Sequence, residues 1–274
     1  MILVAVSSKD VAGLNIAKQV LQHYAFGELT EKFQGSTAYG TEINGKNVRL
    51  ITLNEESTNA QNLTDFFPKV ELVVFISRHS SVSGTPTLSV HTPGNLGSAQ
   101  IGGIARKVSI SPANAMRDAL GAMIRLRMEM HLDYEVSYEG THHGPSLDVP
   151  TMFVELGSSP KQWADLRAAE AVGHAAMEAV SKFGNPTVKA VLGIGGPHYS
   201  SKFSRIALES QIAFGHMIPK YSIPRIDAEI LKQCIERTLE RVESVILDWK
   251  GIKGEDKQPL IRMLVENGIS FEKM

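Results

Sequence analysis

The chain has 274 residues and a formal net charge of −1, a length that supports a core without disulfide or metal staples. The balanced charge excludes a long basic nucleic-acid surface but not a local basic patch, and the single cysteine, Cys234, excludes an internal disulfide framework. Because every apolar run is too short for a signal or membrane segment, we expect a cytoplasmic protein without membrane contact.

The apolar pattern predicts strands and helices that alternate along the chain. In order they are a strand over 2–6, a helix over 11–23, a hairpin around 44–45, a strand over 72–76, a helix from 112 to about 131, strands over 134–139 and 152–156, a helix ending near 184–186, a strand over 188–192 and a long helix over about 227–247. The continuous apolar runs at 72–76 and 188–192 are typical of strands buried on both faces.

Polar residues and glycine mark the ends of several elements. Asn44-Gly45 indicates a hairpin because both central residues of this turn need positive φ. Ser111-Pro112 places an N-cap before a proline at the first helical position. Ser159 and Gln162 fit a capping box, and Asp227 is placed to cap the last long helix.

This alternation predicts an α/β fold: a mixed, largely parallel sheet with flanking helices. There is no internal repeat, low-complexity tract or linker. We therefore expect one domain over residues 1–274, built as one unit or as two closely packed halves.

Five of the nine histidines lie in loops that follow apparent strands. The loops are Ser77-Arg78-His79-Ser80-Ser81, Leu88-Ser89-Val90-His91-Thr92-Pro93-Gly94-Asn95, Glu139-Gly140-Thr141-His142-His143-Gly144-Pro145 and Gly193-Ile194-Gly195-Gly196-Pro197-His198-Tyr199. Because open α/β sheets bind ligands at the carboxyl ends of their strands, these loops predict one shared site. Histidine ligates metals and transfers protons near neutral pH, so the site is expected to be catalytic.

Four of these five histidines also have a simpler structural interpretation, and His198 is the stronger candidate. His142 and His143 would point to opposite faces of a regular strand and could share an ion only in a turn; one of them could instead pack or cap. His79 and His91 lack the spacing of a helical metal motif, and the loop between them could be a mobile polar loop. His198 follows Gly195-Gly196-Pro197, which allows the backbone to approach a ligand closely.

Two further side chains have both a functional and a structural interpretation. Glu155 lies in an otherwise apolar run and needs a buried partner; it is a candidate ligand, orienting group or general base, or the partner of an arginine such as Arg117. Lys202 follows the glycine loop and could hold a phosphate or an oxyanion, or be an ordinary solvated lysine. The chain has no dinucleotide fingerprint, Walker motif or G-x-S-x-G elbow.

Taken together, these motifs resemble the archaeal- and plant-type D-aminoacyl-tRNA deacylases, also called D-tyrosyl-tRNA deacylases. The resemblance runs through the four loops above and through Phe153-Val154-Glu155-Leu156-Gly157-Ser158 with Trp163, Lys202 and Gly215-His216. It implies a fold similar to phosphorylases and peptidyl-tRNA hydrolases. The implied activity is hydrolysis of the ester of a D-aminoacyl-tRNA such as D-Tyr-tRNA, with zinc, two ions per chain, as cofactor.

The resemblance does not assign the zinc ligands, and the histidines are the natural candidates. We expect metal ligands among His79, His91, His143, His198 and His216. We expect catalytic roles for Glu155, Lys202 and His142, and substrate contacts from Arg78, Asn95, Thr141 and Tyr199. Zinc would acidify a water and polarise the ester carbonyl, with Glu155 as the proton acceptor. The expected partner is the acceptor end of tRNA, with no DNA, and the expected state is a monomer.

Three alternatives remain open on the sequence alone. The first is a zinc-dependent amidase or esterase that acts on a small acylated metabolite. It would be favoured if the basic residues Arg78, Arg117, Arg125, Lys202, Arg205 and Lys220 lie away from the histidine loops. The second is a tRNA-end binding module without chemistry, which would show steep salt dependence and no turnover. The third is a metal-free enzyme in which histidine–carboxylate pairs orient the water.

Overall fold

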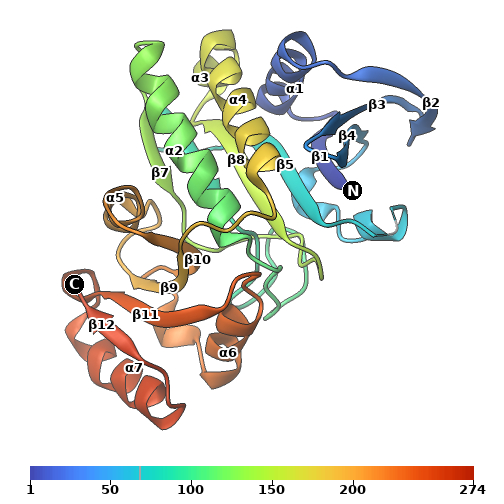
Figure 1. The fold of residues 1–274 in the computed structure, drawn as a ribbon. Coiled ribbons are helices and arrows are strands. Elements are labelled where there is room, and N and C mark those ends of the chain that lie inside the picture. Colours follow the sequence, from blue (N-terminus) through green and yellow to red (C-terminus); the bar gives the residue numbers. More distant parts are fainter. Residues whose placement is uncertain (68) are drawn as a thin grey trace.

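The computed structural model describes residues 1–67 and 69–274 and contains two sheets (Figure 1). The larger sheet has the order β2-β3-β4-β1-β5-β8-β6-β7. Its strands are β1 Ile2–Ser7, β2 Gly27–Phe33, β3 Ser36–Ile43, β4 Lys46–Leu53, β5 Leu72–Arg78, β6 Thr87–His91, β7 Glu135–Tyr138 and β8 Thr151–Gly157. The smaller sheet has the order β10-β9-β11-β12. Its strands are β9 Lys189–Gly195, β10 Ile212–Ile218, β11 Val242–Asp248 and β12 Phe271–Lys273.

The pairing of the strands confirms a mixed, largely parallel α/β fold. All pairs in the smaller sheet are parallel, as are β4–β1, β1–β5, β5–β8 and β6–β7 in the larger one. The helices are α1 Val11–His23, α2 Ala113–Glu129, α3 Pro160–Trp163, α4 Leu166–Lys182, α5 Ser201–Glu209, α6 Ala228–Glu236 and α7 Gly254–Glu266. None of the helices in the described part of the chain has the length and apolar character of a membrane span.

Several predicted elements are confirmed by their local chemistry. β1 and α1 lie where the apolar pattern placed them, and Asp10 caps α1 by accepting a hydrogen bond from the backbone N–H of Gly13. The hairpin between β3 and β4 turns at Asn44 and Gly45, whose φ angles are 50° and 74°. A glycine or asparagine tolerates this backbone, which explains why the turn was readable from the sequence.

The long helix predicted over 227–247 is wrong in its second half. α6 ends at Glu236, and Thr238 and Leu239 cross to pair with the loop at Ser111. Residues 242–248 then form β11 between β9 and β12. A short strand buried on both faces also places apolar residues at helical spacing, and the β-branched residues Val242, Val245 and Ile246 favour the strand.

The first turn of α2 is capped by a residue that is far away in the sequence. Ser111 was expected to be its N-cap, but the backbone N–H groups of Ala113 and Asn114 instead donate to the two carboxylate oxygens of Glu240, each at 3.0 Å. A carboxylate at this position also interacts favourably with the helix dipole. The cap joins the loop before β11 to the start of α2.

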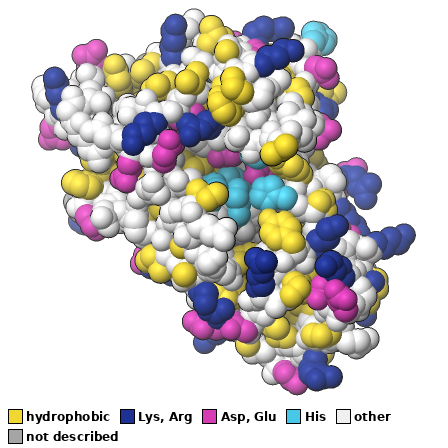
Figure 2. Space-filling model, turned by 180° about the vertical axis from the view of Figure 1, so that it is seen from behind, with side chains coloured by type: hydrophobic (Ala, Val, Ile, Leu, Met, Phe, Trp, Pro, Cys, Tyr) yellow, Lys and Arg dark blue, Asp and Glu magenta, His cyan; other side chains and the backbone are white. Residues whose placement is uncertain are grey.

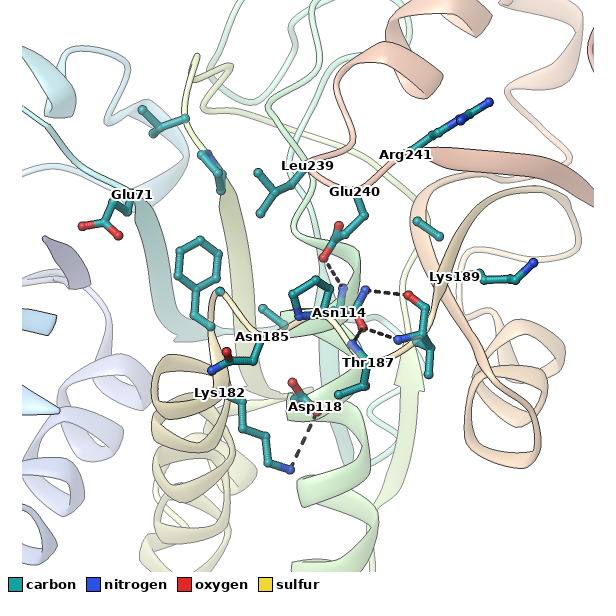
Figure 3. A pocket seen from close by; sticks show the side chains of 18 of the residues that line it. Glu71, Asn114, Asp118, Lys182, Asn185, Thr187, Lys189, Leu239, Glu240 and Arg241 are labelled. Atoms are coloured by element: carbon teal, nitrogen blue, oxygen red, sulfur yellow. Dashed lines mark hydrogen bonds and ion pairs between the residues drawn. The ribbon is translucent and has the colours of Figure 1, made fainter. Parts of the chain in front are cut away.

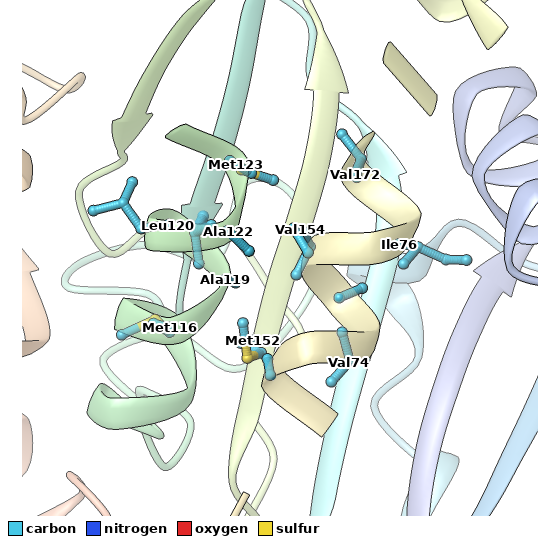
Figure 4. Close-up of a cluster of buried hydrophobic side chains, with 14 of the residues drawn as sticks. Val74, Ile76, Met116, Ala119, Leu120, Ala122, Met123, Met152, Val154 and Val172 are labelled. Carbon is cyan, nitrogen blue, oxygen red and sulfur yellow. The ribbon is translucent and has the colours of Figure 1, made fainter. Parts of the chain in front are cut away.

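One face of the larger sheet packs against α2 and α4 to form the main core (Figure 4). Val74, Ile76, Met152 and Val154 on β5 and β8 face these helices, and the many alanines of α2 and α4 allow the helices to approach the sheet closely. The same core includes apolar residues of the smaller sheet and of α5, among them Phe203, Phe214 and Ile246. The two sheets are therefore joined by a continuous apolar core.

The other face of β5, β8 and β6 carries both aromatic and polar residues in register, and Phe75 and Phe153 belong to a second apolar core there. Ser77 pairs with Glu155, which pairs with Ser89, and one row away Phe75 pairs with Phe153, which pairs with His91. Because side chains alternate along a strand, these residues share the face opposite the main core. The sequence predicts a site at the carboxyl ends of parallel strands. Because β6 runs antiparallel to β8, the site instead extends across a face of the sheet.

A cavity of about 1160 Å³ lies between α2, α4 and the start of β11 (Figure 3). No histidine lines it, and several of its polar groups already have partners: Glu240 caps α2, Lys182 lies 3.7 Å from Asp118, and the Asn114 amide bonds to residues 187 and 188. Since the chemistry of a site requires groups that face a ligand, we interpret this cavity as a structural cleft.

Candidate functional site

Glu139, the residue after β7, is the centre of the histidine cluster. It is fully buried, its Oε2 accepts a hydrogen bond from Nε2 of His198 at 2.9 Å, and Nε2 of His142 lies 3.7 Å from the same oxygen. Its Oε1 lies 3.2 Å from Nδ1 of His79 but has no oriented hydrogen bond. Burial opposes ionisation, yet the His198 hydrogen bond and the surrounding histidines hold the pKa of Glu139 well below its usual range.

Three histidines form a second part of the cluster. Nδ1 of His142 donates to the carbonyl oxygen of Gly140 at 2.8 Å, and Nδ1 of His143 donates to that of Gly144 at 2.7 Å. These bonds leave the Nε2 lone pairs free, and Nε2 of His143 lies 3.2 Å from Nε2 of His91. Nδ1 of His91 is buried without a partner.

Backbone conformation explains how adjacent histidines reach one place. His143 has a φ of 41° and lies outside any strand, so its ring turns to the same side as that of His142, with ring centroids 4.2 Å apart. Burial lowers the pKa of His91 and His142 well below the usual value and that of His143 to about 4. Burial therefore favours the neutral form of all three imidazoles, which is the form that binds metals.

Glu155 and His79 form the third part of the cluster. The hydroxyl of Ser77 donates to Oε1 of Glu155 at 2.6 Å, and Oε2 lies 3.5 Å from Nδ1 of His79. Burial raises the pKa of Glu155 to about 7, with His79 lowering it and the nearby Glu139 raising it. On its other side, Nε2 of His79 lies 2.5 Å from the hydroxyl of Tyr199.

The donor atoms of the cluster are close enough to hold cations. Three sets of side chains have ligand atoms within 4.8 Å of one another: His91, His142 and His143; Glu139, His142 and His198; and His79, Glu139 and Glu155. Among the described residues, Nδ1 of His91 and Oε1 of Glu139 are buried polar atoms without a hydrogen-bond partner. Neutral imidazoles and carboxylates are ligands that zinc prefers, so the cluster fits that metal.

Two adjoining hollows open above the cluster. The larger, about 500 Å³, is lined by Arg78, His79, Glu155, His198 and Tyr199, among others. The smaller, about 220 Å³, is lined by Asn95, Thr141, Tyr221 and Arg225, among others. His142, His143 and Ile101 line both hollows. Figure 2 shows the histidines at the floor of this region, with Lys and Arg side chains on both sides of it.

Most of the predicted site residues lie in this region. Arg78, His79, His142, His143, Glu155, His198 and Tyr199 line the larger hollow, and Asn95 and Thr141 line the smaller one. His91 is fully buried below them, stacked on Phe153 at 5.1 Å. Segments that are more than a hundred residues apart are therefore brought to one place.

Asn95 and Thr141 have structural partners within the smaller hollow. The amide of Asn95 donates to the carbonyl oxygens of Gly102 and Ile104. The hydroxyl oxygen of Thr141 accepts a hydrogen bond from the backbone N–H of Met217. Both residues therefore hold loops that form the hollow.

The structure does not bring His216 or Lys202 into the hollows, against expectation. Nε2 of His216 donates to the carbonyl oxygen of Arg237 and Nδ1 lies 3.1 Å from the Thr141 hydroxyl, so neither nitrogen is available to a metal. The ammonium group of Lys202 lies 2.9 Å from Oδ1 of Asp248. A buried hydrogen-bonded role explains the first residue, and an ion pair explains the second.

Three residues of the site had no predicted role. Glu139 was named only as the first residue of the loop that carries the double histidine, although a carboxylate at this position is a usable signal. Ser77 was part of a predicted loop, but no functional role was predicted for it. Tyr221, whose hydroxyl lies 2.9 Å from Nδ1 of His198, gives no signal in the sequence because it reaches the site from the loop after β10.

The basic residues divide into two groups. Arg117 donates to backbone carbonyl oxygens, and Arg125 and Arg205 pair with helix carboxylates away from the hollows. Arg78 and Arg225 line the hollows, with Arg78 paired to Glu56 at 3.1 Å. Of the six basic residues named in the sequence analysis, only Arg78 lines either hollow, so the positive charge at the site is small, which by itself favours the small-metabolite alternative.

A family model described as D-aminoacyl-tRNA deacylase matches residues 66–272 of the chain. The chain belongs to the D-aminoacyl-tRNA deacylase family. It is 37% identical to the D-aminoacyl-tRNA deacylase of Thermococcus kodakarensis over 99% of both chains. It is also 37% identical to that of Pyrococcus furiosus over 96% of both chains. As a member of this family the chain is an enzyme of the hydrolase class.

The chain also matches a solved structure along its whole length. A crystal structure described as a conserved protein of unknown function has a TM-score of 0.86 and 29% identity, with 100% of this chain and 95% of that chain covered. The match includes both sheets, and the histidine cluster described above is thus part of a fold that a second protein shares from end to end.

Proposed function

We propose that the chain hydrolyses the ester between a D-amino acid and the 3′-terminal adenosine of tRNA, as in D-Tyr-tRNA, and releases the free D-amino acid and the tRNA. The observation that carries the proposal is the pair of buried carboxylates, Glu139 and Glu155, on either side of His79 at the floor of an open hollow. Burying carboxylates is costly, and binding alone does not require it.

We assign a zinc ion to the three-histidine set of His91, His142 and His143, whose ligand atoms lie within 4.8 Å of one another, with Nε2 of His91 and Nε2 of His143 3.2 Å apart. When bound there, zinc supplies a Lewis acid for the ester carbonyl and lowers the pKa of water. The carbonyl oxygens of Gly140 and Gly144 orient two of the rings through their Nδ1–H groups. A second ion bound by His79, Glu139 and Glu155 would occupy the carboxylate of the proposed general base. We therefore place no ion there, and Glu155 stays free to accept a proton.

Glu155 is the proposed general base. It takes a proton from the attacking water, whose oxygen forms a bond to the ester carbonyl carbon while the bond from that carbon to the ribose oxygen breaks. The proton then passes to the ribose oxygen, so that a hydroxyl leaves. A pKa of about 7 suits a group that both accepts and returns a proton. The Ser77 hydroxyl and His79 hold its two oxygens in place.

The two hollows suggest how the substrate lies. The ester would sit over His142 and His143, which line both hollows. The terminal adenosine, the larger group, would occupy the 500 Å³ hollow, with Arg78 at a phosphate and Tyr199 beside the base. The amino-acid side chain would enter the 220 Å³ hollow beside Tyr221. Contact restricted to the acceptor end is consistent with a nearly neutral protein that acts on tRNA.

The test is the release of tyrosine from D-Tyr-tRNA and L-Tyr-tRNA, each before and after metal chelation. We expect turnover of the D-substrate only, lost on chelation and restored by zinc. D-selective turnover that survives chelation would support the proposed reaction and refute the role of zinc in it. Failure to hydrolyse either substrate would refute the proposal in favour of a hydrolase for small acylated metabolites.

A further inference from the structure

We propose a second transition-metal site, formed by His23, Glu170 and His174 on the helix-covered side of the larger sheet. His23 is the last residue of α1, and Glu170 and His174 lie one turn apart on α4. Their ligand atoms lie within 4.8 Å of one another, and none of the three belongs to the cluster over β5, β8 and β6. The site takes a divalent cation that prefers imidazole, with Zn²⁺ as the reference ion.

The spacing of the ligand atoms is close to that of a zinc site. Oε1 of Glu170 lies 3.5 Å from Nε2 of His23 and 3.8 Å from Nε2 of His174. Ligands at about 2.0–2.1 Å from a tetrahedral zinc ion lie roughly 3.3 Å apart, so small side-chain rotations close the site. Residues i and i+4 of one helix share a face, which is why Glu170 and His174 converge without any loop.

Tyr24 orients one of the ligands. Its hydroxyl lies 2.9 Å from Nδ1 of His174, and this contact leaves Nε2 of His174 directed at Glu170. A hydrogen bond to the nitrogen opposite the metal is the usual way in which proteins fix a ligating imidazole. The ring of His23 packs against that of His174 with centroids 5.1 Å apart, which places both imidazoles on one side of the carboxylate.

Two protein histidines and one carboxylate leave a position for water. The three side chains are each about one-third exposed, at 34%, 31% and 29%, so a fourth ligand has access from solvent. Imidazole ligands disfavour Mg²⁺ and Ca²⁺, which take oxygen ligands. His23 ends α1, and the other two ligands lie on α4. The bound ion therefore cross-links two helices that are far apart in sequence.

The experiment is zinc binding to the full chain after chelation and dialysis. Zn²⁺ is titrated against a chromophoric competitor for the wild type, the double variant His23→Ala/His174→Ala and the control His131→Ala, whose histidine is exposed and belongs to no donor set. We expect the double variant to bind one Zn²⁺ fewer per chain than the wild type and the control. Equal stoichiometry and affinity in all three proteins would overturn the site and leave His23 and His174 as ion-pair partners of Glu170.

Two milder variants separate binding from folding. Glu170→Gln keeps the size of the side chain, and it should bind Zn²⁺ at this site more weakly while remaining folded by circular dichroism. Tyr24→Phe removes only the hydroxyl that orients His174, and we expect its affinity to fall about 10- to 100-fold with the stoichiometry retained at high zinc. An unchanged affinity in both variants would contradict the assigned ligands. Deacylation is not part of the readout, so the result does not depend on the proposed function.

Discussion

The two faces of the larger sheet have different roles at β5 and β8: one packs the main core, and the other carries side chains of the histidine cluster. On β5 and β8, Val74, Ile76, Met152 and Val154 point into the main core under α2 and α4. On the alternate positions of the same strands, Ser77 and Glu155 point to the histidine cluster. A shift of one residue along either strand would exchange the two sets, because side chains alternate with a period of two. The register that packs the core therefore also aligns the site.

The difference between the faces lies in which groups are buried. The core face buries apolar groups, and its contribution to stability is roughly proportional to area. The site face has an apolar core of its own around Phe75 and Phe153, and beside it a buried glutamate, Glu139, is paired with histidines. Substitutions of the polar site residues should therefore change catalysis more than stability, and substitutions of the apolar residues in the main core should do the reverse.

The largest effect is expected at the double histidine. His142→Ala or His143→Ala should reduce hydrolysis of D-Tyr-tRNA by about 10⁴-fold or more, since a lost metal ligand removes several kcal/mol of transition-state stabilisation. Single-turnover rates measure the loss, and near-ultraviolet circular dichroism checks the fold. Full turnover in both single variants would refute the proposed centre.

Glu155→Gln should lower kcat by about 10²- to 10⁴-fold, because a general base is lost and the shape of the side chain is kept. The zinc content of this variant should equal that of the wild type, as measured by atomic emission. If one ion per chain were lost with the charge, Glu155 would be a ligand and not the base.

On the core face, Met152→Ala should cost about 2–5 kcal/mol of unfolding free energy, because it removes a fully buried side chain from between β8 and the helices. Urea unfolding measures the change. The rate per folded molecule should stay close to that of the wild type, and a rate loss as large as that of Glu155→Gln would show that the two faces are not independent.

The smallest effect is expected at His216, the histidine of predicted ligand type that lies outside the hollows. His216→Ala should cost about 1–3 kcal/mol, because the Arg237 carbonyl oxygen and the Thr141 hydroxyl lose a buried partner. Its zinc stoichiometry should be unchanged. If this variant bound one zinc ion fewer per chain than the wild type, His216 would be a metal ligand.

Much of the fold was readable because its signals are local. The β3–β4 turn at Asn44 and Gly45, the start of α1 after Asp10 and the apolar strands β5 and β9 each depend on a few neighbouring residues. β11 was not readable, since its apolar spacing fits a helix equally well and only its pairing with β9 and β12 decides between them.

For the site, the sequence by itself determined the chemical groups: histidines in loops of small residues and a carboxylate, Glu155, in an apolar strand that needed a partner. The tertiary structure alone decided which of these groups meet. It placed Glu139 at the centre of the cluster, brought Tyr221 to His198, and gave His216 and Lys202 protein partners outside the hollows. The physical reason is that a side chain's chemistry belongs to its own residue, whereas its burial and partners depend on strand register and on loops far away in sequence.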